Sequence, residues 1–200
     1  MSVDYPAAVT IRQGGTPSVT VEADDNFLPQ LITRVVDGTL HIEAKGIAFG
    51  QRVTPTREVR ITLTVKDLRQ LDLSSAGSVK VESLETDALK ISVSGAGSLS
   101  LSKLNVKTLR LDLSGVGSVT ADGTADDIAL DIRGVGSFHG EALDAQNATV
   151  DISGMGSATL WVKVHLTADI SGTGSVSYYG SPELTRNVSG LGSIHKLGDK

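Results

Sequence analysis

Apolar and polar residues alternate along most of the chain, and from residue 71 onward the alternation recurs every 18 to 20 residues. One apolar column, four positions before a recurring glycine, consists of Leu73, Val93, Leu113, Ile132, Ile152, Ile170 and Val188. A second column, two positions after that glycine, consists of Val79, Leu99, Val119, Phe138, Ala158, Val176 and Ile194. Period-two alternation on both sides of a turn predicts β-strands with one buried face.

The recurring turn has the form Ser-Gly-x-Gly-Ser, with variants in its first two positions. Its second glycines are Gly77, Gly97, Gly117, Gly136, Gly156, Gly174 and Gly192. We interpret these seven glycines as structural turn residues. They suit either a corner that needs positive φ or a close approach of backbone between neighbouring repeats.

Two short strands and two turns in about 19 residues make one rung of a coil, because a single repeat cannot bury its own apolar face. The sequence therefore predicts an all-β fold, a single-stranded parallel β-helix (solenoid) of about seven to eight rungs. Phe138 stands among the small residues Ala121, Gly140 and Ala158, as conserved core volume in stacked rungs requires.

We expect one domain, with an irregular β cap over residues 1–57 and repeat rungs over residues 58–200. Residues 58–65 alternate and lead straight towards Leu68 and Leu71, so they are expected to form the first rung. Residues 46–55 are the one candidate flexible loop. Tyr178, Tyr179 and the irregular residues 182–186 predict the end of the regular coil.

Composition excludes several classes of protein. The net charge of -5 argues against a nucleic-acid partner, and the absence of cysteine excludes disulfides, a thiolate nucleophile and Cys-based zinc sites. No apolar run reaches the roughly 18 residues of a transmembrane segment. Residues 1–6 lack the features of a signal peptide, so the protein is either cytoplasmic or begins after a removed export segment.

One outward-facing column carries most of the candidate chemistry. It lies five positions before the second glycine and reads Asp72, Ser92, Asp112, Asp131, Asp151, Asp169 and Asn187. Stacked carboxylates repel each other, so the column is either a solvated face or a site for Ca²⁺, a cationic partner or a hydroxyl-rich partner. Arg133 replaces serine beside it and would neutralise its acidic neighbours.

The candidate binding residues are Asp112, Asp131, Arg133, Asp151 and Asp169. No cofactor, metal ligand set or catalytic residue is predicted. The alternative hypothesis is a carbohydrate-active enzyme, a polysaccharide lyase or hydrolase, that uses the face of Asp112, Asp131, Arg133 and Asp151. An aromatic patch of Trp161 and Tyr179 would suit stacking on sugar rings, whereas Tyr178 falls in an inward column.

Residues 9–15 (Val-Thr-Ile-Arg-Gln-Gly-Gly), the segment starting at Asp37-Gly-Thr-Leu-His-Ile, and a Leu68-x-x-Leu71 step precede the repeated turns. In these features nearly the whole chain resembles the bacterial head GIN domain family of autotransporter adhesins. The resemblance implies a β-helix that is exported to the cell surface or periplasm and takes part in adhesion. It supplies no catalytic residues.

We therefore expect a non-enzymatic adhesion or binding module whose partner is an unknown surface ligand, a polysaccharide or a protein. A third hypothesis is a structural spacer that self-associates as a homo-oligomer through its long faces.

Overall fold

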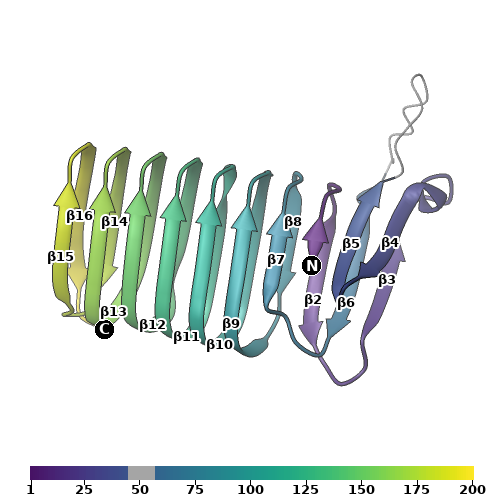
Figure 1. Ribbon diagram of the computed structural model, residues 1–200, viewed down its shortest axis with the longest axis horizontal. Coiled ribbons are helices and arrows are strands. Elements are labelled where there is room, and N and C mark those ends of the chain that lie inside the picture. The colour runs from purple at the N-terminus through teal and green to yellow at the C-terminus, as the bar shows by residue number, and fades with distance from the viewer. Residues whose placement is uncertain (45–56) are drawn as a thin grey trace.

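The computed structural model describes residues 1–44 and 57–200 and is an elongated stack of β-strands (Figure 1). Strand makes up 74% of it, and no α-helix occurs in the described residues. The first strands are β1 (Ser2–Val3), β2 (Ala8–Gln13), β3 (Ser18–Glu22), β4 (Leu31–Val36), β5 (Thr39–Ala44), β6 (Arg60–Val65), β7 (Gln70–Leu73) and β8 (Gly77–Val81), with a 3-10 turn η1 at Leu28–Gln30. The others are β9 (Leu84–Val93), β10 (Ala96–Leu113), β11 (Val116–Ile132), β12 (Val135–Ile152), β13 (Met155–Ile170), β14 (Thr173–Tyr179), β15 (Glu183–Val188) and β16 (Leu191–Gly198).

Successive repeats pair in parallel and in register, so the predicted columns are real stacks. The turn serine shows this best, because Ser98 pairs with Ser118 and Ser118 pairs with Ser137. The prediction of a parallel β-helix is confirmed. The solenoid has about six turns, slightly fewer than the seven to eight rungs expected.

The core is a continuous apolar column that runs through the stack. Alternate residues of each strand enter it, and every buried residue among those described is hydrophobic or glycine. In β11, for example, Val119, Ala121, Ile128, Leu130 and Ile132 are all buried. Since each rung buries its apolar side chains against the rungs above and below, the core extends without a break from the cap to β14.

The chain does not climb the stack in sequence order at its N-terminal end. The short strand β1 lies between β5 and β7, and β2 lies between β6 and β8. Val9 of β2 is therefore in register with Ile61 on one side and Val79 on the other. Residues 60–65 belong to the stack and the chain runs on from them into β7, but residues 2–13 lie between the two in the stack.

Antiparallel strands close this end of the solenoid. β3 pairs with β6, and β4 pairs with β5, so neither parallel strand leaves its outer edge open (Figure 1). The outer sheet edge at this end therefore belongs to the short strands β3 and β4, each of which pairs on one side only, and short edge strands limit pairing with another chain. The predicted loop at residues 46–55 lies outside the described residues.

At the other end, the coil continues further than the irregular sequence suggests. β15 stacks on β13, and β16 stacks on β14, with Leu184 and Ile194 packed against the core. Arg186, the register partner of the buried Ala168, is exposed there. Among the described strands, β15 pairs only with β13, so its other side is open to solvent and this position tolerates a charged residue.

The turn glycines allow neighbouring backbones to approach closely. A Cβ atom built on Gly117 would lie 2.2 Å from the carbonyl oxygen of Gly97, and one on Gly97 would lie 2.4 Å from that of Gly77. Neither residue has a φ angle in the left-handed region. Of the two reasons that could require glycine here, the approach of the next rung applies, because any side chain would overlap a backbone oxygen.

We expect Gly117→Ala to lower the free energy of unfolding by about 2 kcal/mol or more, since the contacting atom is rigid backbone. Gly136 is a matched control in the same column, because its Cβ would lie 3.1 Å from the Gly117 oxygen and needs only a small adjustment. Urea denaturation of both variants measures the difference. Equal destabilisation would show that close approach does not set the glycine requirement.

The Phe138 ring occupies core volume that larger side chains at neighbouring positions would otherwise need. Its side chain is 1% exposed, and Ala158 is its register partner in the next rung. A Cβ atom on Gly140 would meet the Phe138 ring at 2.4 Å. The ring therefore occupies the space that a side chain at residue 140 would need, as the small residues around it predict.

We expect Gly140→Ala to destabilise the protein by about 1–3 kcal/mol through overpacking. Phe138→Leu alone leaves a void, but the double variant should recover part of both losses, because the smaller side chain makes room for the new methyl group. Thermal and urea unfolding of the four proteins test this coupling. Strictly additive losses would contradict direct competition between the two residues.

Candidate binding face

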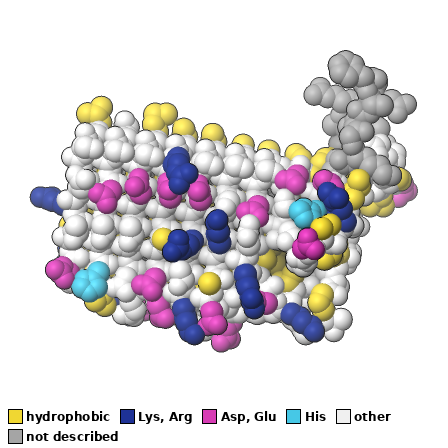
Figure 2. Space-filling model, viewed as in Figure 1, with side chains coloured by type: hydrophobic (Ala, Val, Ile, Leu, Met, Phe, Trp, Pro, Cys, Tyr) yellow, Lys and Arg dark blue, Asp and Glu magenta, His cyan; other side chains and the backbone are white. Residues whose placement is uncertain are grey.

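The acidic residues of adjacent rungs stand side by side on one face of the solenoid. Asp112 pairs in register with Asp131, Asp131 with Asp151, and Asp151 with Asp169. These four residues, here called the acidic column, occur on β10 to β13, one on each strand. Figure 2 shows a row of Asp and Glu side chains along one face of the solenoid. Asp72 continues the column beyond Ser92.

Arg133 joins two carboxylates of the acidic column. It hydrogen-bonds Asp131 through Nε at 3.1 Å and through Nη2, and Nη2 also lies 3.7 Å from Oδ2 of Asp112 in the preceding rung. These carboxylates, Asp131 first, raise the pKa of Arg133 above its ordinary value. The contacts reduce repulsion between Asp112 and Asp131. No ion pair or side-chain hydrogen bond engages Asp151 or Asp169 in the described part of the chain.

The acidic column does not form a cage for a metal ion. Within residues 1–44 and 57–200, no three His, Asp or Glu side chains converge as a metal-binding group. In-register carboxylates lie along a line at the strand spacing of about 4.8 Å and do not surround a point. The arrangement is better suited to an extended partner that contacts successive rungs.

A groove of about 870 Å³ lies next to the acidic column, on the same side of the solenoid. The segment between β6 and β7 forms one wall, and outward-facing side chains of β9, β10 and β11 form its floor. Lys90 and Arg110 line the groove, and each stands two residues before the acidic column's position on its strand. Residues two apart on a strand point to the same face, so groove and acidic column form one surface.

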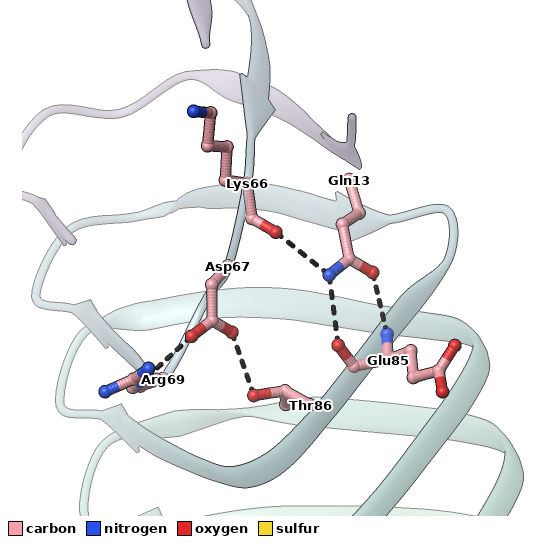
Figure 3. Close-up of polar contacts among 6 residues, drawn as sticks. All are labelled: Gln13, Lys66, Asp67, Arg69, Glu85 and Thr86. Carbon is pink, nitrogen blue, oxygen red and sulfur yellow. Dashed lines mark hydrogen bonds and ion pairs between the residues drawn. The ribbon is translucent and has the colours of Figure 1, made fainter. Parts of the chain in front are cut away.

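Gln13 fixes the wall of the groove to its floor (Figure 3). Its Nε2 donates to the carbonyl oxygens of Lys66 and Glu85, each at 3.0 Å, and its Oε1 accepts from the Glu85 backbone N–H at 2.9 Å. The Gln13 side chain, at the end of β2, thus hydrogen-bonds backbone groups of two other segments. Because β2 is the inserted strand, the groove's position depends on the N-terminal residues.

Asp67 connects the same wall to β9 (Figure 3). It accepts hydrogen bonds from Nε of Arg69 at 2.6 Å and from the Thr86 hydroxyl at 2.9 Å. These hydrogen bonds, with Arg69 first, hold the pKa of Asp67 below its ordinary value. The bond through Nε leaves the two terminal amino groups of Arg69 available to another acceptor, and the side chain is 83% exposed.

We expect the Asp67 carboxyl to titrate below its ordinary pKa in NMR experiments, and Thr86→Val to move that pKa back upward. A depressed folded-state pKa stabilises the protein above the unfolded value of about 3.9, and this stabilisation is lost as the pH falls. Solvent screening limits its size to about 1 kcal/mol or less. An ordinary pKa for Asp67, unchanged by Thr86→Val, would contradict these hydrogen bonds.

The groove contains five basic side chains: Lys66, Arg69, Lys90, Lys107 and Arg110. Lys107 pairs with Asp87 at 2.7 Å, and Arg69 pairs with Asp67. The side-chain charges of Lys66, Lys90 and Arg110 have no ion-pair partner among the described residues. Lys90 and Arg110 are also register partners on adjacent rungs, which places two unneutralised positive charges next to each other.

The aromatic residues near the C-terminal end are covered by lysines. Nζ of Lys200 lies 5.4 Å from the centre of the Trp161 ring and 4.6 Å from that of Tyr179, and Lys163 lies over Trp161 at 5.3 Å. Tyr178 is buried, in agreement with its inward column. The two outer rings therefore make cation–π contacts, which reduces the ring surface available for stacking on a sugar.

Exposed apolar side chains follow the edge of the solenoid, at the central position of the Gly-x-Gly turns. Val116, Val135 and Met155 are stacked in register and exposed, and Leu191 is exposed at the last turn. Figure 2 shows hydrophobic side chains along this edge. Self-association through an apolar edge would depend on this row. No helix in the described residues has the length and apolar character needed to cross a membrane.

Sequence reasoning identified the acidic column but missed the groove. The stacking of Asp112, Asp131, Asp151 and Asp169 follows from a single repeat period. The groove depends on where a non-repeating segment, residues 66–69, meets the rungs. A signal was present in the polar, charged residues Lys66, Asp67 and Arg69, which interrupt the alternation between two apolar strands.

Comparison with known proteins identifies the repeated turns and the fold. The sequence model of a family described as "Putative auto-transporter adhesin, head GIN domain" matches residues 1–182. No curated protein matches the chain.

Three solved structures share the fold across almost the whole chain. A "putative adhesin" from Bacteroides fragilis has 26% sequence identity and a TM-score of 0.91, covering 98% of this chain and 90% of that one. A "putative lipid binding protein" from Parabacteroides distasonis has 23% identity and a TM-score of 0.79, with coverage of 98% and 92%. A "putative adhesin" from the same species has 21% identity and a TM-score of 0.70, with the same coverage.

Proposed function

The chain belongs to the head GIN domain family, and from this premise we propose that it is an exported, non-enzymatic adhesion module that binds a polysaccharide. Its family and the adhesin from Bacteroides fragilis support an adhesin-like role at the cell surface or in the periplasm.

The observation that carries the proposal is the in-register surface formed by the acidic column and the groove. Asp112, Asp131, Arg133, Asp151 and Asp169 present charged hydrogen-bonding groups at one position of successive rungs. Carboxylates accept hydrogen bonds from hydroxyl groups, and a polysaccharide offers hydroxyls along its whole length. A rigid row of acceptors can therefore contact several units of one extended chain.

The same surface argues against catalysis by the predicted residues. An acid–base pair needs carboxylates that flank a scissile bond within a binding site. Asp131 and Asp112 instead share the Arg133 guanidinium on an outward face, and the groove's lining includes none of these three residues. We therefore favour binding without turnover over the hydrolase or lyase alternative.

We expect the protein to bind one or more members of a panel of neutral, acidic and basic polysaccharides in equilibrium measurements. Changing Asp112, Asp131, Arg133 and Asp151 together to Ala should weaken that binding by about tenfold or more, because several charge-assisted hydrogen bonds are lost. Prolonged incubation with each bound polysaccharide should release no new chain ends.

A control variant changes Glu22, Asp25, Glu58 and Arg60 to Ala, removing the same number of acidic and basic groups from the exposed cap. It should bind as the wild type does. Loss of binding in both variants would indicate a nonspecific effect of charge, and cleavage that depends on Asp131 or Arg133 would overturn the non-enzymatic role.

A further inference from the structure

We propose that the groove is an anion-binding site and that the polysaccharide it takes carries carboxylate groups. This inference rests on the proposed function and specifies the class of its ligand. The acidic column would repel the ligand's carboxylates, so these bind in the groove and not along the acidic column. The central observation is the pair Lys90 and Arg110, which are register partners on β9 and β10 in the groove.

Two stacked positive charges without a counter-ion are unfavourable in the free protein. Lys90 and Arg110 lie about one strand spacing apart, roughly 4.8 Å between backbones, and both are exposed. The nearest acidic group on the strand of Arg110 is Asp112, which already lies 3.7 Å from Arg133. An anion between Lys90 and Arg110 would relieve their repulsion and gain two charge-assisted hydrogen bonds.

Other donors extend the site along the groove. Lys66 has no ion-pair partner among the described residues, and Arg69 is held through Nε by Asp67, with its terminal amino groups left over. The carboxylates Asp67 and Asp87 are each engaged by a base, Arg69 and Lys107 respectively. Glu85 and Asp126 also line the groove and have no ion-pair partner among the described residues, so its five basic side chains exceed its four acidic ones by a single charge, although the whole protein is acidic. The excess of positive charge is concentrated at Lys90 and Arg110, which are register partners.

The remaining lining favours a carbohydrate over an acidic protein segment. The Thr124 hydroxyl donates to Oδ1 of Asn105 at 3.2 Å, which leaves the Asn105 amide N–H groups for a ligand. Of the apolar residues of the floor, Leu89 and Val106 are buried, and the exposed Ala88 offers only a methyl group. A protein partner would need exposed apolar anchors, whereas a polymer of sugars can be bound by hydroxyl, amide and charged groups alone.

The test compares binding of the full chain to polygalacturonate, heparin, poly-glutamate and neutral dextran. We expect polygalacturonate to bind, dextran to bind more weakly, and rising salt concentration to weaken the polygalacturonate interaction. Lys90→Ala with Arg110→Ala should reduce polygalacturonate affinity by about tenfold or more, and exchanging the two residues for each other (Lys90→Arg, Arg110→Lys) should preserve it.

The matched control, Lys80→Ala with Lys196→Ala, removes two positive charges that lie outside the groove and should leave affinity unchanged. Binding of dextran but not polygalacturonate would overturn the anion site while leaving adhesion intact. Preferential binding of heparin would overturn the proposal by showing that the groove selects sulfate groups over carboxylates. Preferential binding of poly-glutamate would overturn it by showing that the ligand is an acidic peptide and not a carbohydrate. Binding of none of the four, together with failure of the broader panel, would overturn the proposed function as well.

Discussion

The structure depends on one constraint, which is that the strands and turns of every rung must lie at hydrogen-bonding distance from those of the next. The constraint is most severe at the Gly-x-Gly turns, where the carbonyl oxygen of Gly97 lies only 2.2 Å from the position that a Cβ of Gly117 would take. Once the turns are superimposed, the strand segments next to them are held in register, and differences in repeat length are accommodated by register shifts farther along, as between Leu101 and Leu104. Equivalent residues of successive repeats then lie next to each other. A charged residue that recurs in each repeat therefore forms a row on the surface.

This constraint explains why the repeats were predictable. The period of 18 to 20 residues and its apolar columns determine which side chains are buried and which carboxylates share a row. Phe138 and Gly140 could even be assigned to one crowded layer, because the surrounding residues are small. Wherever local alternation and the repeat period agree, sequence and structure agree.

The non-repeating parts could not be predicted in this way. Nothing in the alternation of residues 8–13 says that β2 lies between β6 and β8, because an alternating strand fits equally well against either neighbour. The groove has the same origin, since Gln13 reaches Lys66 and Glu85 only because β2 is inserted. The pairing of Lys90 with Arg110 was implicit in the repeat, but it gained significance only when the groove placed both in a concave surface.

The insertion of β2 also restricts the order in which the molecule can assemble. A solenoid that climbs in sequence order can grow one rung at a time as the chain emerges. Here residues 8–13 of β2 pair with segments found 52 and 70 positions later, so they must wait for β6 and β8 before they are held. The regular rungs from β9 onward have no such dependence. Strand β2 joins the cap to them because it pairs with β6 on one side and β8 on the other.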